Sequence, residues 1–431
     1  MRISSGGTAF FPCLALYLGC SVVLLLTYTG QIGEANAYMG MQPWDMSVAG
    51  YFGFAIGLPV VAWIVSMTKG RPSDFFRVFY GTIVVTSFLV LHPVSGRFSA
   101  PEIFTGIVFL FLPFVMIEAL DAILPTIKIR GVIGASWLEL LIVLVLLFVM
   151  LNAAARPPAS AGFALDVSYD RRLEGRDIYG AGSWLAYGLS MAMNGLAPYL
   201  AFRAGLGSRI FIFGVALTAV GFFYWLLGVK APLVFVIVSA LLGVFVRKGN
   251  LSNVGRYFLA AVLGFGLVVL VEWLFFDGYS LIADFFFRRV FAVQAEIQGY
   301  YLKFLLNEKT VSWSWLYGSF DRNFAATFHI GEHFMGNEAS NANTNAFSHQ
   351  FAAKGFIGYI CALVLVPFIL VIFDRLYNSS RNPSYLFLGF LYGVLVIEQA
   401  YTVAMVSSGV ALLLVLTLLE AECDADKALT V

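Results

Sequence analysis

The sequence predicts an all-α membrane protein that crosses a bilayer about twelve times and carries two long connections on its outer side. Hydrophobic residues make up 60% of the 431 positions, more apolar surface than one soluble core can bury. Apolar runs of about 20 residues, the length of a membrane-spanning helix, recur along the chain. Lysine and arginine collect in alternate connections, as they do on the cytoplasmic side of membrane proteins.

The apolar segments fall into three groups separated by the two long connections. Five lie in residues 1–152, four in 183–276 and three in 355–421. The long connections are 153–182 and 277–354, and a tail, 422–431, follows the last segment. The predicted spans are 8–29, 49–68, 76–92, 102–125, 131–152, 183–203, 207–228, 230–247, 256–276, 355–374, 384–402 and 404–421.

The first apolar run poses a choice between a retained helix and a signal peptide. Ala35-Asn36-Ala37 follows it and has the small-x-small pattern of a cleavage site. The run is longer than the usual signal-peptide core of about 7–15 residues. Its length therefore favours an uncleaved first span.

The distribution of lysine and arginine predicts which connections lie on each side of the membrane. Since lysine and arginine accumulate in cytoplasmic loops, the even-numbered connections and both termini are predicted to be cytoplasmic. The connections 153–182 and 277–354 then face outward. The basic residues of the even-numbered connections are Lys69, Arg71, Arg77, Lys128, Arg130, Arg203, Arg209, Arg247, Lys248, Arg256, Arg375 and Arg381.

Both outward connections nevertheless carry arginines. Cations kept on the side where topology disfavours them point to an anionic ligand, and solvated loop charge is the alternative. The guanidinium fork matches a diphosphate, although an anionic phospholipid headgroup would suit the same side chains. The candidate diphosphate-binding residues are Arg171, Arg172, Arg176, Arg288 and Arg289, with Lys230 in the tight hairpin between the seventh and eighth spans.

The two arginine clusters share a spacing. Ten residues separate Arg171 from Gly182, and ten separate Arg288 from Gly299. Residues 280–306 also place apolar and basic side chains at helical spacing, which predicts an amphipathic helix lying at the outer membrane surface.

Four stretches in this order and topology carry a family resemblance. They are YDRRLEGRDIYGAG, FFFRRVFAVQAEIQG, NEASNANTNAFSHQFAAKGFIGY and VIEQAYTVAMVSSG. With them, the chain resembles the Wzy-type O-antigen and repeat-unit polymerases, bacterial inner-membrane proteins with two large periplasmic loops that each bear an Arg-(ten residues)-Gly segment. These proteins look like relatives of the O-antigen ligases, and the resemblance implies a GT-C-like helical architecture with interfacial helices in the loops.

The resemblance implies a glycosyltransferase that works at the periplasmic face. It would move a growing glycan from undecaprenyl diphosphate onto the terminal sugar of a new carrier-linked repeat unit, with membrane lipid around it and with a flippase and a chain-length regulator as further partners. A ligase typically has a histidine eleven residues before a Gly-x-x-Gly motif, but here Thr344 precedes Gly355 at that distance. This departure favours a polymerase over a ligase, and a repeat-unit flippase is the third alternative.

Glycosyl transfer from a diphosphate carrier requires a stabilised leaving group and, commonly, a base that takes the proton of the acceptor hydroxyl. The sequence motif Asp424-Ala425-Asp426, a pattern that holds metals in other glycosyltransferases, falls on the predicted cytoplasmic tail, so we expect no metal and no cofactor. The candidate catalytic residues are His349, Glu398 and Glu338. A buried hydrogen bond or a structural salt bridge is the alternative role for each.

Polar residues before the tenth span suit sugar hydroxyls, because amides donate and accept hydrogen bonds at once. A helix N-cap or a loop would use the same residues. The net charge of +1 leaves no basic face for nucleic acid, which we exclude as a partner. The candidate glycan-binding residues are Asn341, Asn343, Asn345 and, as a stacking platform, Trp315.

Overall fold

The computed structural model describes residues 6–41, 48–95, 98–127, 131–164, 167–180, 182–249, 251–307, 326–336 and 341–420. Apart from one isolated bridge between Ile133 and Glu420, these residues form helices, turns and irregular segments, with no strand among them. The all-α character predicted from the sequence is confirmed.

Several of the described helices are long and apolar enough to cross a membrane, as in a multi-pass protein. Seven stretches meet both criteria, and four apolar helices are shorter. The exact number of spans stays a prediction. The seven are Phe10–Ala35, Pro72–Pro93, Ala100–Ile123, Ala135–Ala154, Ile210–Leu227, Leu251–Phe275 and Ala346–Ser380, and the shorter four are Gly50–Ser66, Ala231–Arg247, Ser384–Glu398 and Val410–Leu419.

The chain divides into two compact units that interleave along the sequence. The first unit comprises residues 1–124, 252–371 and 393–401, and the second comprises 125–251, 372–392 and 402–431. The first unit contains α1 (Gly6–Thr27), α2 (Gly33–Ala35), α3 (Val48–Ser66), α4 (Pro72–Phe79), α5 (Ser87–Ser95), α6 (Ala100–Ile123), α13 (Val254–Phe275), α14 (Val293–Asn307), α16 (Ala326–Met335) and most of α17 (Ala346–Ser380).

The second unit is built mainly from the middle of the chain. It contains α7 (Ala135–Ala154), α8 (Ser168–Tyr179), α9 (Trp184–Met191), α10 (Ala197–Gly207), α11 (Ile210–Leu227), α12 (Ala231–Arg247), most of α18 (Ser384–Glu398), most of α19 (Tyr401–Met405) and α20 (Val410–Leu419).

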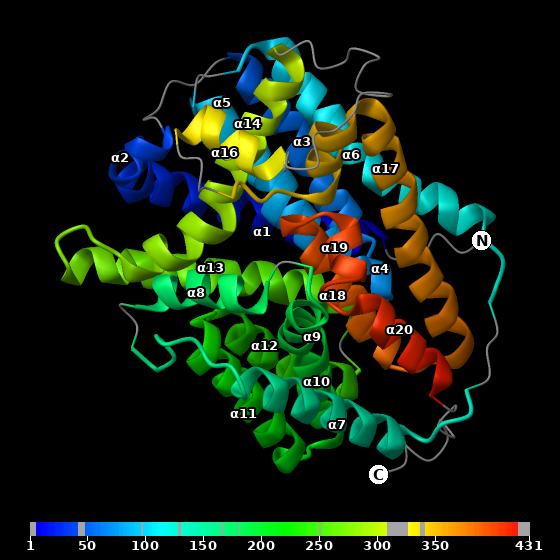
Figure 1. The fold of residues 1–431 in the computed structure, drawn as a ribbon. Coiled ribbons are helices and arrows are strands. Elements are labelled where there is room, and N and C mark those ends of the chain that lie inside the picture. Colours follow the sequence, from blue (N-terminus) through cyan, green and yellow to red (C-terminus); the bar gives the residue numbers. More distant parts are fainter. Residues whose placement is uncertain are drawn as a thin grey trace. The chain divides into compact units, whose positions relative to one another are not determined.

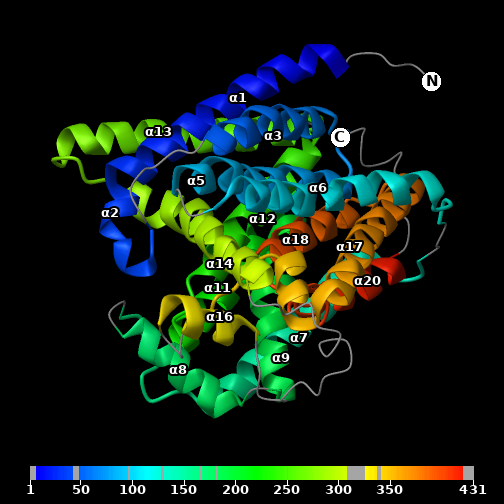
Figure 2. The same cartoon turned by 90° about the horizontal axis from the view of Figure 1, so that it is seen from above.

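In the first unit, α3 and α13 lie along α1 (Figure 2). One side of α13 remains covered with exposed apolar residues, including Leu267, Leu274 and Phe275. A helix that is apolar all round and still exposes large hydrophobic side chains is suited to lipid contact.

The long connection 277–354 contributes packed helices to the first unit. The π-helical turns Ala283–Ala292 run directly into α14, so the segment predicted over 280–306 is helical. Residues 295–302 of α14 are buried on every side, so this part lacks the exposed face of the predicted amphipathic surface helix. Helix α16 lies beside α14 (Figure 1). Tyr301 of α14 and Ile330 of α16 share a buried cluster with Ala352, from the start of α17. This connection is therefore held on the unit by a core of its own.

In the second unit, α10 and α12 approach each other closely because glycines face each other (Figure 1). A Cβ atom at Gly205 would lie 2.1 Å from the carbonyl oxygen of Ala240, and one at Gly243 would lie 2.2 Å from that of Phe202. Small residues at such a crossing let two membrane helices pack backbone against backbone.

Two basic residues of the even-numbered connections form ion pairs within the second unit. Arg203 Nε donates to Glu139 Oε1 at 3.1 Å, and its Nη1 donates to Glu420 Oε1 at 2.8 Å. Arg209 forks onto both oxygens of Glu139, at 2.6 and 2.7 Å. Since buried charges are stable only when paired, this network ties α7, α10 and the end of α20 together.

Candidate functional site

The second arginine cluster lies on the π-helical turns that precede α14. Arg288 is largely enclosed, with 16% of its side chain exposed, and its Nε lies 2.7 Å from Asp284 Oδ1. Arg289 is exposed and makes no ion pair with any described residue. Of the two predicted diphosphate ligands, Arg289 is thus the one whose charge is open to an external anion.

The start of this helix is fixed by hydrogen bonds that involve Glu272 at the end of α13. Its carboxylate accepts from the hydroxyl of Ser280 at 2.5 Å and from the backbone N–H of Ile282 at 3.0 Å. Gln31 of the first unit also donates to the carbonyl of Ser280, at 3.0 Å. An acidic side chain that satisfies the first N–H groups of a helix stabilises that end.

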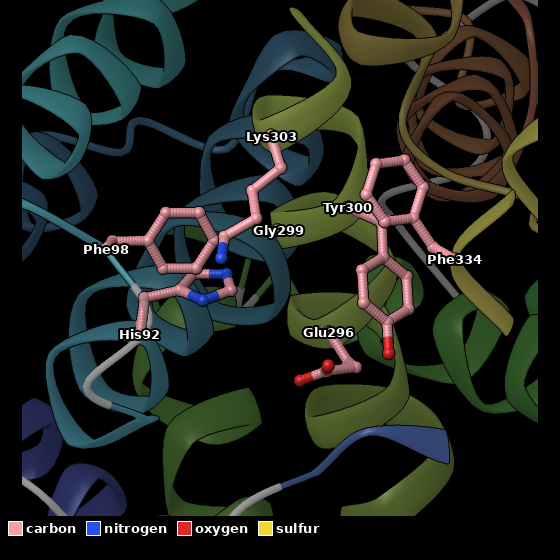
Figure 3. Close-up of a pocket in the computed structure, with 7 residues that line it drawn as sticks. All are labelled: His92, Phe98, Glu296, Gly299, Tyr300, Lys303 and Phe334. Carbon is pink, nitrogen blue, oxygen red and sulfur yellow. The ribbon is translucent and has the colours of Figure 1, made fainter. Parts of the chain in front are cut away.

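A cavity of about 230 Å³ lies at the other end of the Arg-(ten residues)-Gly segment. Figure 3 shows side chains from three parts of the first unit turned toward it. We call it the Gly299 pocket, and its lining residues are His92, Phe98, Glu296, Gly299, Tyr300, Lys303 and Phe334.

Glycine at position 299 is required by close packing against α5. A Cβ atom there would lie 2.4 Å from Cε1 of His92. The Nζ atom of Lys303, one turn further along, lies 5.2 Å from the centroid of the Phe98 ring. Tyr300 is held in place because its hydroxyl donates to the carbonyl of Met39. The walls of the pocket are therefore largely apolar, although its lining includes the charged residues Glu296 and Lys303.

The polar segment before α17 packs against the same helices. The N–H of Ala342 donates to the carbonyl of Thr327 at 3.1 Å, and its carbonyl accepts from the hydroxyl of Tyr301 at 3.0 Å. Burial raises the pKa of Tyr301, so this hydroxyl stays a donor. Asn341 and Asn343 flank Ala342 and are exposed, as sugar contacts require.

Asn345 has a structural role in place of the predicted glycan contact. It is buried, and its Oδ1 accepts from the backbone N–H of Ser348 at 3.0 Å. It therefore caps the start of α17, as asparagine commonly does. Thr344, at the ligase-histidine position, is also buried.

His349 lies on the first turns of α17, ahead of a sharp break in that helix. Gly355 has φ of 62° and ψ of −153°, values open almost only to glycine. Helix α17 is therefore two segments, one that carries His349 and one that begins at the Gly-x-x-Gly motif. A Cβ atom at Gly358 would lie 2.1 Å from the carbonyl oxygen of Gln350, so the motif lets the segments fold closely. The His349 Nδ1 atom is buried without a hydrogen-bond partner among the described residues.

Arg171, in the second unit, has a structural role. Its side chain is fully buried. Its Nη1 donates at 3.2 Å to the carbonyls of both Tyr224 and Trp225, and its Nη2 donates to the carbonyl of Ala164. Because the last carbonyls of a helix lack partners within it, Arg171 caps the end of α11.

Arg172 and Arg176 share one face of α8 and are exposed. Neither pairs with a described carboxylate. The hairpin that carries exposed Lys230 touches the start of the same helix, since a Cβ atom at Gly228 would lie 2.5 Å from the carbonyl oxygen of Ser168. Three predicted cations thus lie on neighbouring elements of one unit.

Glu174, on the same helix, holds the preceding loop. The Ser160 hydroxyl, with the N–H groups of Ala159 and Ser160, lowers the pKa of the Glu174 carboxyl below its ordinary value. The N–H of Ala159 donates at 2.5 Å and that of Ser160 at 3.0 Å.

The remaining predicted residues divide between exposed positions and positions outside the described residues. Glu398 is exposed at the end of α18. Glu338, Trp315 and the Asp424-Ala425-Asp426 motif lie outside the described residues. Among the residues that the structure does describe, no group of three or more His, Cys, Asp or Glu side chains could hold a metal.

The sequence reasoning missed the Gly299 pocket. One signal was available, because Glu296, Gly299, Tyr300 and Lys303 follow the i, i+3, i+4, i+7 spacing of one helix face. The partners of this face, His92, Phe98 and Phe334, come from distant parts of the chain and share no pattern with it.

No protein-family description, no curated protein and no solved structure matches the chain.

Proposed function

We propose that this protein polymerises lipid-linked oligosaccharide repeat units at the periplasmic face of a bacterial inner membrane. In this reaction the growing glycan moves from undecaprenyl diphosphate onto the terminal sugar of a new carrier-linked repeat unit. The observation that supports the proposal most is the set of exposed guanidinium groups on the helices of the two long connections. These are Arg172 and Arg176 on α8 and Arg289 ahead of α14, none of them paired with a described carboxylate.

Charge development in this reaction explains why such groups are useful. The acceptor hydroxyl oxygen attacks the anomeric carbon of the donor sugar, and the bond from that carbon to the diphosphate oxygen breaks. The leaving diphosphate gains negative charge, which guanidinium donors at a partly dry interface stabilise. The hydroxyl proton must pass to a base. His349 and Glu398 are the candidates among the described residues, and His349 has a buried Nδ1 without a described partner.

The proposal is tested by chain growth in cells. A strain that lacks this gene is complemented with the intact protein, Arg172→Met, Arg289→Met or the control Arg247→Met, which changes an exposed arginine on the predicted cytoplasmic side. Removing one charge-assisted contact of about 1.5–3 kcal/mol should slow transfer about ten- to a hundredfold. We expect the surface glycan to shorten toward single repeat units in the first two variants and to keep its length in the control.

Full-length glycan in both Arg172→Met and Arg289→Met would contradict the proposal. The deletion strain also separates the alternatives. A missing polymerase leaves single repeat units on the surface lipid, a missing ligase leaves none, and a missing flippase leaves the precursor inside the cell.

A further inference from the structure

A groove of about 590 Å³ lies between α3 and α6 in the first unit, where the two helices contact each other (Figure 1). It follows one face of each helix, and apart from Arg77 and Glu118 its lining is apolar. Two of the lining side chains, Trp63 and Val108, are more than half exposed. Because α6 is long and apolar enough to cross a membrane, this open groove, which we call the α3–α6 groove, is placed to face lipid.

The dimensions of the α3–α6 groove limit what fills it. Glu118 lies eleven residues after Ile107 on α6, which at about 1.5 Å per residue makes the groove about 16 Å long. One leaflet of a bilayer has a hydrocarbon depth of about 15 Å, half of the whole core. Spread over its length, the volume gives a mean cross-section of about 36 Å², whereas a helix about 10 Å wide needs roughly 80 Å². A hydrocarbon chain therefore fits the groove and a second helix does not.

Charged side chains close one end of the groove. The Nη2 atom of Arg77 lies 2.8 Å from Oε1 of Glu118, whose side chain is 59% exposed. One turn further along α6, Asp121 Oδ2 lies 3.0 Å from Nη1 of Arg71. This ion pair holds the connection between α3 and α4 against the end of α6. The same connection carries exposed Lys69, whose ammonium group pairs with no described carboxylate.

We infer that the α3–α6 groove binds one acyl chain of a phospholipid whose headgroup carries a phosphate and a primary ammonium group, as in phosphatidylethanolamine. The inference goes beyond the proposed function and does not depend on it. The apolar length of the groove receives the acyl chain, and the charged end lies at the level of the headgroup. There Lys69 donates to the phosphate, and the second carboxylate oxygen of Glu118 accepts from the ammonium group.

The balance of charge at this end favours a zwitterionic headgroup over an anionic one. An anionic headgroup meets no excess of positive charge there, whereas an ammonium and a phosphate group each find an exposed group of opposite sign. The polyprenyl diphosphate of the proposed function belongs at the opposite face, because the connection between α3 and α4 is predicted to be cytoplasmic. The charged side chains at this end are Lys69, Arg71, Arg77, Asp74, Glu118 and Asp121.

Quenching of tryptophan fluorescence by brominated lipid tests the inference. The full-length protein is placed in phosphatidylcholine nanodiscs that contain a rising mole fraction of phosphatidylethanolamine, phosphatidylglycerol or phosphatidylcholine brominated on an acyl chain. Subtracting the Trp63→Phe spectrum isolates Trp63, and subtracting the Trp137→Phe spectrum isolates Trp137, an exposed residue of α7 outside the groove. We expect brominated phosphatidylethanolamine to half-quench Trp63 at about a tenfold lower mole fraction than Trp137, because the headgroup gains charge-assisted hydrogen bonds. The other two lipids should quench both residues alike.

Two variants with matched controls locate the effect. Val108→Phe narrows the groove, and Glu118→Gln removes the charged acceptor for the ammonium group, so each should abolish the preferential quenching of Trp63. Val22→Phe, at an exposed valine of α1, and Glu34→Gln, at an exposed glutamate of α2, should behave as the intact protein does. The melting temperature of each variant is measured in the same nanodiscs, and if Glu118→Gln fails to fold, Val108→Phe decides.

Three results would overturn the inference. The first is half-quenching of Trp63 and Trp137 at the same mole fraction of phosphatidylethanolamine, or preferential quenching that persists in Val108→Phe. The second is quenching of Trp63 by phosphatidylglycerol or phosphatidylcholine as strong as that by phosphatidylethanolamine, because the headgroup would then not be recognised. The third is complete relief of the quenching by equimolar undecaprenyl phosphate, which would assign the groove to the glycan carrier.

Discussion

Two neighbouring arginines of α8 differ in what surrounds them. Arg171 is fully buried and donates to three backbone carbonyls, whereas Arg172 is exposed and pairs with no described carboxylate. Helical geometry explains the difference, because successive residues point about 100° apart around the axis. The sequence RR reads as one basic cluster, yet one member stabilises the fold and the other remains available to a ligand.

Replacing these two arginines separately should affect different properties. Arg171→Met leaves buried carbonyls without donors, each at a cost of about 1–3 kcal/mol, so the melting temperature of the purified protein should drop clearly. Arg172→Met should melt as the intact protein does but lose chain growth. Equal melting temperatures in the two variants would contradict the capping role of Arg171.

Gly355 offers a second test at a single residue. Its backbone conformation costs other residues about 1–3 kcal/mol, so Gly355→Ala should lower the melting temperature or straighten α17. Gly264→Ala is the matched control, because a Cβ atom at Gly264 meets nothing within 4 Å. Similar melting curves for Gly355→Ala and Gly264→Ala would show that the break in α17 is not required.

Residue chemistry nominates candidate residues but does not tell which of them are free to contact a ligand. From the sequence, the amide of Asn345 suits a sugar ligand and a helix cap equally. The hydrogen bond from the Ser348 N–H to its Oδ1 shows that it caps the helix. Likewise, the Gly-x-x-Gly motif is evident in the sequence, but the break at Gly355 depends on backbone angles that no periodicity reveals.

At the scale of elements, the Glu174 carboxylate of α8 holds residues 159 and 160 of the preceding loop. Glu174 accepts from Ser160 and Ala159, and these bonds lower its pKa. A carboxyl whose pKa is lower in the folded state stabilises the fold above its ordinary value of about 4.3, and this contribution is lost as the pH falls from there through the lowered value.

The loop should therefore loosen in acid. We expect the hydrogen-exchange protection of the Ala159 and Ser160 amides, corrected for intrinsic rates, to be full at neutral pH and to fall below about pH 4. Glu174→Gln should show weak protection with little pH dependence, while Asp177→Asn, at an exposed position on the same helix, should behave as the intact protein does. The same acid transition in Glu174→Gln would assign it to another group.

Elements with a strong pattern were the easiest to predict. The spacing of residues 280–306 predicts a helix, which is present as the π-helical turns Ala283–Ala292 and α14, but residues 295–302 are buried on every side and have no exposed face. Its role in a pocket was not predictable, since the opposite wall comes from α5 and α16. Local periodicity reports which face of a helix is apolar, but it does not report which distant segment covers that face.

At the scale of the whole molecule, apolar composition dictates a multi-pass membrane protein and leaves the pairing of its helices open. Each unit is assembled from separate stretches of chain, and α17 and α18 each contribute to both. Such pairings depend on close packing between helices, as at Gly205 and Gly243, and the hydropathy of the sequence does not reveal them. The two arginine clusters belong to different units, so their convergence on one headgroup stays a prediction.

A double-mutant cycle on diphosphate binding tests that convergence most directly. Binding of farnesyl diphosphate to the protein in nanodiscs is measured for the intact chain, Arg172→Met, Arg289→Met and the double variant. If both guanidinium groups contact one headgroup, each single change should weaken binding by about 1.5–3 kcal/mol, and the double change should depart from their sum by at least about 0.5 kcal/mol. Strictly additive effects, or intact affinity in either single variant, would contradict a shared diphosphate site.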